Sequence, residues 1–317
     1  MHTSLFCRTR SCTYILVLLF GSAPALLAQD FKLDPGCRLP FADIASSSDP
    51  FQSCGNCGAV SVSAGPAQVS AKAFESKAKN NFCADASAVT IVDFRTLRAM
   101  QAQHVDKSHL GNRHVLHGFF QMPDGRTIGE GDVVRLKAWI LNAHVSDCPT
   151  GESVNCSQAG FANNDLHIPL LDPTVDAQRA QDECTSVTAE ISPHFRPAVW
   201  AELDMKTPVK NVVRITGPLF FDNSHQPCKT STHTDPGNAA PFRSSLWEIH
   251  PIYKLEVCAS TEPSQCDVNS SSEGEWIPYD KWVTRPDTVT EPTGQKQRAG
   301  CHARPGGATK PIECPVS

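Results

Sequence analysis

The stretch from residue 134 to residue 140 reads VRLKAWI and decides the fold class. Its apolar side chains recur at every second position, and Arg135, Lys137 and Trp139 stand between them. Alternation with a period of two predicts a β-strand that buries one face. We therefore expect a mainly β protein built outward from this strand.

Four further strands are predicted after residue 140. They cover residues 165–171, 185–191, 212–221 and 246–257, and a short helix over 198–204 fits between the third and fourth strands of the five. Five strands with one interposed helix are the layout of a small closed barrel of the OB type. A β-sandwich is the alternative.

The N-terminus has the features of an export signal. Arg8 and Arg10 precede the apolar run 14–20, and small residues follow as far as Ala28. This pattern is typical of a signal peptide, which we place at residues 1–28. No later stretch has the roughly 20 apolar residues that a membrane helix needs. We therefore expect a secreted or periplasmic protein without a transmembrane segment.

The rest of the chain divides into three predicted parts. Residues 29–112 form a cysteine-rich, irregular lead-in with two short helices, over 69–83 and 93–103. The barrel occupies 113–266. Residues 267–317 are rich in Ser, Pro, Thr and Gly without an apolar period, so we expect a disordered or loosely tethered tail.

Cysteine usage supports the same compartment. The chain has 14 cysteines, and the predicted signal peptide contains two of them. An even set of this size in an exported chain predicts disulfides. Only two close pairs are predicted individually, Cys148 with Cys156 and Cys301 with Cys314, and the other pairings stay open.

The charge balance bears on the partner. The chain has 28 Lys and Arg against 33 Asp and Glu, a formal net charge of −5. Non-specific nucleic-acid binding needs a basic surface that neutralises phosphates. Nucleic acid is therefore an unlikely partner, and a small molecule, a glycan or an envelope protein is expected instead.

Two predicted strands carry an acidic residue and a histidine two positions apart. Asp165 pairs in this way with His167, and Glu248 with His250. Side chains at i and i+2 share one face of a strand, so four ligands converge where the strands are neighbours, and His225 could add a fifth. Imidazole and carboxylate suit zinc or another divalent metal. The alternative is an ordinary polar strand face.

Other polar residues complete the candidate site. Glu190 would be the general base for a metal-bound water. Arg196 and Arg243 could bind an anionic ligand, and Trp247 could stack on one. The alternatives are a salt bridge that ties a strand to the following helix, and core packing for the tryptophan.

Several of these segments also carry a resemblance. Residues 164–168 (NDLHI) and 247–251 (WEIHP), with 131–134, 212–217 and 219–225, resemble a group of uncharacterised bacterial exported proteins that have an OB-like barrel. The resemblance covers roughly residues 131–258. It implies the fold and the compartment, and it transfers no catalytic role.

The function favoured at this point is an exported, non-enzymatic binding module. The chain has no Gly-x-Ser-x-Gly motif and no Gly-rich phosphate loop. The alternatives are a metal-dependent hydrolase, nuclease- or esterase-like, that uses the Asp165, His167, His225, Glu248 and His250 cluster, and a structural envelope protein.

Overall fold

The computed structural model describes most of the chain between residues 89 and 291. The described residues are 89–106, 113–145, 152, 164–175, 182–191, 200, 207–208, 210–272, 274–286 and 290–291. Outside them lie the predicted signal peptide, the helix over 69–83, most of the helix over 198–204, Arg196, and the two predicted close cysteine pairs. No helix among the described residues is long and apolar enough to cross a membrane.

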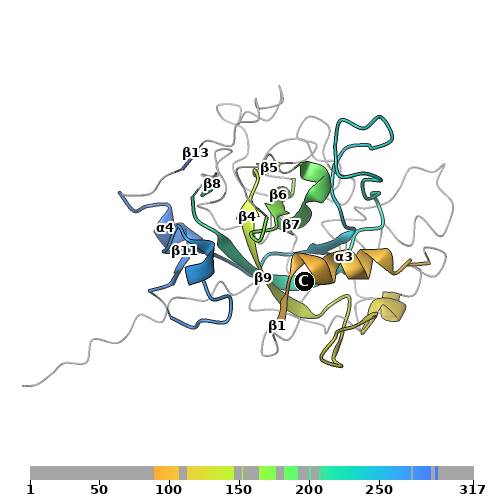
Figure 1. Cartoon of the computed structure of the whole chain (residues 1–317), viewed down its shortest axis with the longest axis horizontal. Helices are drawn as coiled ribbons and strands as arrows, with labels where there is room; N and C mark the ends of the chain where they lie inside the picture. The colour runs from red at the N-terminus through yellow and green to blue at the C-terminus, as the bar shows by residue number, and fades with distance from the viewer. Residues whose placement is uncertain are drawn as a thin grey trace, which may run out of the picture. The chain divides into compact units, whose positions relative to one another are not determined.

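Five strands close into a barrel (Figure 1). They are β4 (Val133–Ile140), β6 (Leu166–Leu171), β7 (Val187–Ile191), β10 (Trp247–Ile249) and β9 (Val213–Phe221), in that spatial order. The ring closes because β9 also pairs with β4. All neighbours are antiparallel except β7 and β10, which are parallel. The predicted mainly β fold with a small barrel is confirmed.

Further strands extend the barrel at its edges. In the main sheet β1 (Thr90–Val92) pairs with β4, β5 (His144–Val145) with β6, β11 (Lys254–Cys258) with β9, and β12 (Trp276–Pro278) with β11. Two small separate ladders join β2 (Phe120–Gln121) to β3 (Thr127–Ile128) and β8 (Thr207–Pro208) to β13 (Thr290–Glu291).

The fifth predicted strand, 246–257, is two strands rather than one. β10 ends at Ile249 and β11 begins at Lys254, and both pair with the long strand β9. Pro251 has no N–H to donate and interrupts the ladder between them. Gly217 of β9 faces this turn, where an added Cβ would lie 2.5 Å from the Pro251 carbonyl oxygen. Glycine is therefore required at this crossing.

Helix α3 (Phe94–Ala102) confirms the helix predicted over 93–103. Asp93 caps it, because its side chain accepts a hydrogen bond of 2.7 Å from the Thr96 amide. Phe94, Leu97 and Met100 recur on one face and are buried in the same core as the barrel. The end of the predicted lead-in therefore belongs to the barrel unit.

The predicted tail begins too early at residue 267. Strand β12 and helix α4 (Tyr279–Trp282) pack on the barrel, and Trp276, Tyr279 and Trp282 are at most 4% exposed. Three aromatic rings at intervals of three residues bury enough apolar surface to order this segment without a longer apolar period. Residues from 292 onward lie outside the described part.

Two disulfides lie within the described residues, Cys184 with Cys228 and Cys258 with Cys266. They bear out the expectation of disulfides, although the sequence left both pairings open. The first joins the start of β7 to the long connection between β9 and β10. The second closes the loop that leads from β11 to β12.

Candidate functional site

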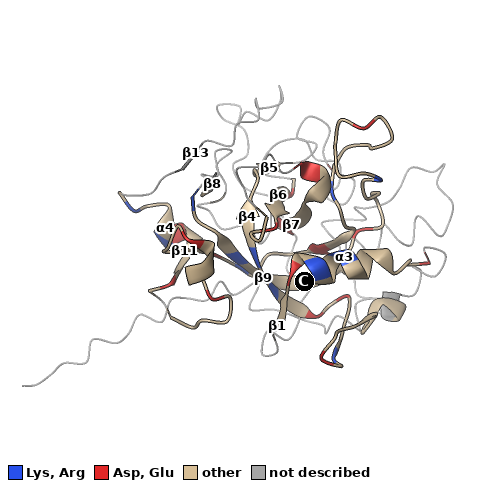
Figure 2. Ribbon diagram, in the orientation of Figure 1, with Lys and Arg blue, Asp and Glu red and all other residues tan. Residues whose placement is uncertain are grey.

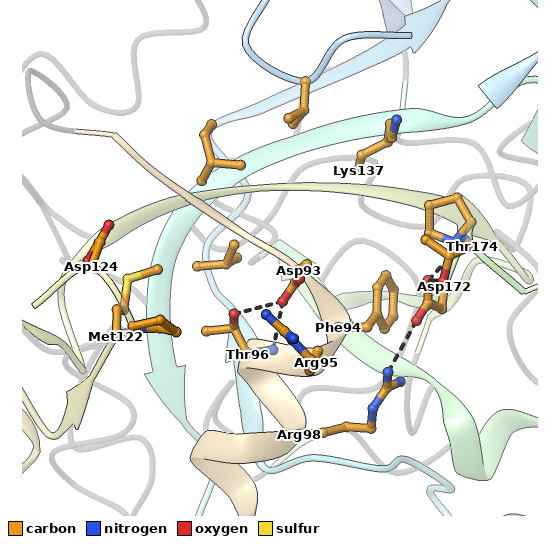
Figure 3. A pocket seen from close by; sticks show the side chains of 15 residues that line it. Asp93, Phe94, Arg95, Thr96, Arg98, Met122, Asp124, Lys137, Asp172 and Thr174 are labelled. Carbon is orange, nitrogen blue, oxygen red and sulfur yellow. Dashed lines mark hydrogen bonds and ion pairs between the residues drawn. The ribbon is translucent and has the colours of Figure 1, made fainter. Parts of the chain in front are cut away.

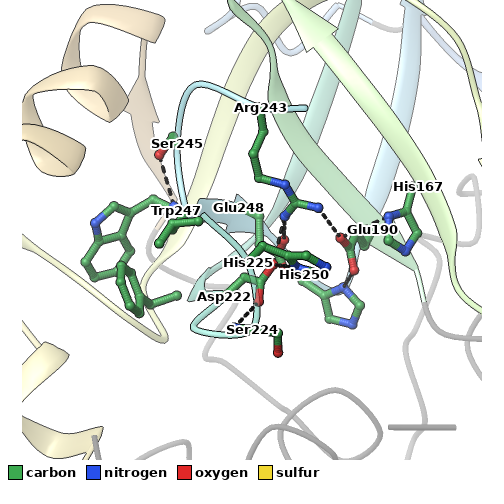
Figure 4. A network of polar contacts seen from close by, with 12 residues as sticks. His167, Glu190, Asp222, Ser224, His225, Arg243, Ser245, Trp247, Glu248 and His250 are labelled. Carbon is green, nitrogen blue, oxygen red and sulfur yellow. Dashed lines mark hydrogen bonds and ion pairs between the residues drawn. The ribbon is translucent and has the colours of Figure 1, made fainter. Parts of the chain in front are cut away.

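The two acid-x-His strands, β6 and β10, are not neighbours. Strand β7 lies between them. His167 on β6 stands opposite Glu190 on β7, and Ile249 on β10 stands opposite Ala189. Glu190 is thereby placed between His167 and His250, as Figure 4 shows.

Glu190 contacts both imidazoles with different oxygen atoms. Its Oε1 lies 3.3 Å from Nδ1 of His167, and its Oε2 lies 3.3 Å from Nδ1 of His250. The apolar neighbours Ile168 and Ala189 point into the barrel core, so this polar group stands on the opposite face of the strands. The three side chains are nonetheless buried, with at most 5% of each exposed.

Two further carboxylates extend the cluster beyond Glu190. Oε1 of Glu152 lies 3.3 Å from Nε2 of His167, and its Oε2 accepts a hydrogen bond of 2.9 Å from the Asp165 amide. Oδ2 of Asp165 lies 4.0 Å from Nε2 of His250. Glu152 was not predicted, because it lies in the connection before β6, where no periodic pattern marks it.

Two overlapping groups of three residues offer donor atoms for a metal ion. In one, atoms of Glu152, Asp165 and His167 lie within 4.8 Å of one another, and in the other, atoms of Asp165, Glu190 and His250 do. A tetrahedral shell with bonds of about 2.0–2.2 Å holds its donors roughly 3.3–3.6 Å apart. The 4.8 Å limit is wider than this spacing, so the donors would have to move closer together around a bound ion.

Arg243 forms a second centre beside these groups (Figure 4). Its Nη1 lies 2.9 Å from Oδ2 of Asp222 and 3.0 Å from Oε2 of Glu248, and its Nη2 lies 3.9 Å from Oε1 of Glu190. Burial alone would lower the pKa of the guanidinium. The attraction of the three carboxylates, Asp222 first, outweighs this and raises the pKa of Arg243 above its ordinary value.

His225 and Glu248 belong to the Arg243 centre rather than to either metal-type group. His225 contacts Oδ2 of Asp222 through Nδ1, and 34% of its side chain is exposed. The predicted single shell of five ligands is therefore divided in the described structure. Asp165, His167 and His250 lie in the two groups of three, and His225 and Glu248 adjoin Arg243.

The structure also places two of the predicted ligand-binding residues. Arg243 is 1% exposed and lies among carboxylates, so it is part of a buried ion-pair network rather than an open anion site. Trp247 is fully buried, with its ring centroid 5.3 Å from that of Phe119 and 5.2 Å from that of Phe221. This packing favours the core role for Trp247.

Charges of both signs occur throughout the described part. Figure 2 shows Lys and Arg as well as Asp and Glu on the strands, and helix α3 carries Arg95 and Arg98 after its acidic cap Asp93. Several of the basic groups lie in pairs, as Arg214 does with Glu256 at 2.7 Å.

A cavity of about 630 Å³ lies elsewhere, between β1, the start of α3 and the turn after β6 (Figure 3). Phe94 and Met122 give it apolar walls, and Arg95, Arg98 and Asp172 give it charge. Nη2 of Arg98 lies 3.3 Å from Oδ2 of Asp172 across its rim. The volume is typical of small-molecule sites, but the cavity shares no residue with the cluster.

Comparisons with models of known protein families, with curated proteins and with solved structures found no match to this chain. The assignment of a function therefore rests on the geometry and chemistry of the cluster.

Proposed function

We propose that this chain is an exported binding module whose barrel binds a divalent transition-metal ion, with zinc the best fit to the donors. The observation that carries the proposal is the convergence of carboxylate and imidazole donors within 4.8 Å at Asp165, Glu190 and His250. Mixed nitrogen and oxygen donors of this kind are preferred ligands of zinc and similar ions.

The position of the cluster on the barrel supports a binding role. We number the five barrel strands one to five in chain order, as β4, β6, β7, β9 and β10. Their order around the barrel is then one, two, three, five, four, which we assign to an OB barrel. OB barrels bind ligands on strands two and three, between the connections that join strands one to two and four to five. Here Glu152 comes from the first of these connections, and Asp222 and Arg243 stand at the two ends of the second.

The chemistry at this position favours a cation. OB barrels that bind nucleic acid use basic grooves with exposed aromatic rings. In this chain strands two, three and five present His167, Glu190 and His250 instead, and Trp247 packs in the core. Carboxylates repel phosphate groups, and they attract a metal ion.

Burial of the ligands supports a non-enzymatic role. Catalytic zinc sites keep one coordination position open to water, whereas structural sites are closed. Asp165 and His250 are 0% exposed and Glu190 is 1% exposed. Both oxygens of Glu190 also face imidazoles, which disfavours its use as a general base for hydrolysis. We therefore rank the hydrolase second to the closed metal site.

Export fits the covalent structure. Cys184 with Cys228 and Cys258 with Cys266 are bonds that persist in oxidising compartments such as the periplasm or the extracellular space. A secreted or periplasmic location is part of the proposal on this ground. The structural envelope role stays a prediction that partner identification would test.

The experiment is metal analysis of untagged protein that has been exported into an oxidising compartment, loaded with excess zinc and dialysed. Elemental mass spectrometry should find at least one zinc ion per chain in the parent, and His250→Ala should lose the ion held at Asp165, Glu190 and His250. His104→Ala, at an exposed position outside the cluster, is the matched control and should keep the metal. A folded parent that retains no zinc would overturn the proposal.

A further inference from the structure

The two groups of three donors share one residue, Asp165. Glu152, Asp165 and His167 form one group, and Asp165, Glu190 and His250 form the other. We propose that the cluster is a binuclear centre, with one divalent ion in each group and the Asp165 carboxylate as the bridge between them. This inference rests on the proposed metal-binding function and specifies the number and arrangement of the ions.

The donors define two positions rather than one. No group of three among the described residues contains both His167 and His250. His167 has Glu152 at 3.3 Å, a partner that belongs to its group alone, and His250 lies 4.0 Å from the shared Asp165. Zinc sites are almost always four-coordinate, so one ion would not use all five of these side chains.

Asp165 is placed to serve both positions. It is fully buried at the start of β6, and its Oδ2 faces His250. Its backbone amide donates to Oε2 of Glu152, and this bond holds the Glu152 carboxylate beside it. A carboxylate between two divalent ions is the usual bridge in two-metal sites, where the ions lie about 3.5–4 Å apart.

Glu190 provides a second link between the two positions. Its oxygens divide between His167 and His250, at 3.3 Å each. A carboxylate that reaches both histidines in this way links the two ligand sets, as a binuclear centre requires.

The charge of the two groups suits divalent cations. The groups contain three carboxylates, from Glu152, Asp165 and Glu190, whereas those of Asp222 and Glu248 already face Arg243. Buried carboxylates are stable when cations lie close to them. Divalent ions in the two groups would provide such cations.

The test is zinc stoichiometry of the full-length, disulfide-bonded protein, by titration calorimetry of the metal-free form and elemental analysis after loading. The parent should bind two ions per chain. Glu152→Gln removes a ligand from only one group and should bind one ion. His225→Gln changes a histidine outside both groups and should still bind two. Circular dichroism of each variant establishes that it is folded.

The outcomes separate this inference from the proposed function. Two ions in the parent and one in Glu152→Gln support the binuclear centre. A parent that saturates at one ion overturns the second site and leaves metal binding intact. This result does not depend on whether any variant folds. A Glu152→Gln protein that still binds two ions overturns the assignment of Glu152. A parent that binds none overturns both proposals.

Discussion

Arg243→Met removes the one guanidinium of the cluster while it keeps most of the side-chain volume. Arg243 is 1% exposed and lies within 4.0 Å of the carboxylates of Asp222, Glu248 and Glu190. Breaking a buried ion pair from one side leaves uncompensated charge and costs about 3–5 kcal/mol. For a domain of this size each kcal/mol lowers Tm by roughly 2–4 °C, so we expect a fall of roughly 6–20 °C.

The assay is urea and thermal unfolding at pH 7, with a chelator present so that metal binding does not contribute to stability. The matched control is Arg98→Met, whose partner is Asp172 and whose side chain is 49% exposed. An exposed pair of this kind is worth at most about 1 kcal/mol. If Arg243→Met is as mild as the control, the ion pairs of Arg243 do not stabilise the barrel by the expected amount.

Three other predictions concern the scaffold. Asp93→Ala should cost about 1 kcal/mol at pH 7 in urea unfolding, because it removes the cap of α3. Burial alone would raise the pKa of Asp93, but hydrogen bonds from the Thr96 hydroxyl and amide outweigh this and lower the pKa. The stabilisation by Asp93 is therefore present above the ordinary pKa of about 3.9 and is lost as the pH falls through the folded pKa. A stability difference between parent and Asp93→Ala that is equal at pH 7 and pH 2 would contradict the cap. Replacing Cys258 and Cys266 by alanine should lower the free energy of unfolding by roughly 2.5 kcal/mol, because the disulfide restricts the loop in the unfolded chain. An unchanged melting curve would show that the bond does not stabilise the fold. Gly217→Ala should cost about 1–3 kcal/mol, because its Cβ would lie 2.5 Å from a backbone carbonyl oxygen, and a fully stable variant would mean that the strands can separate there.

The sequence predicted the barrel well because its strands are strongly patterned. The alternation around Leu136 and the i, i+2 spacing of Asp165 and His167 are local properties, and both appear in the structure on the expected faces. The cap at Asp93 is local in the same sense. The division of the fifth strand was missed, although Pro251 marks it within the longer apolar run.

The assembly of the candidate site could not be predicted in the same way. The insertion of β7 between β6 and β10 is a property of strand order, and it makes Glu190 the centre of the cluster. Glu152 lies in the connection between β4 and β6, and Arg243 lies near the end of the long connection between β9 and β10. Contacts between residues so far apart in sequence depend on loop closure, which leaves no periodic signal.

The disulfide between Cys184 and Cys228 links the cluster to the redox state of its surroundings. Asp222 and Arg243 stand at opposite ends of one connection, and this bond fastens that connection to the chain just before β7 across a separation of 44 residues. In a reducing cytoplasm the connection would be tethered only by weaker contacts. On the export route that we propose, this connection is therefore fastened only once the chain is in an oxidising compartment.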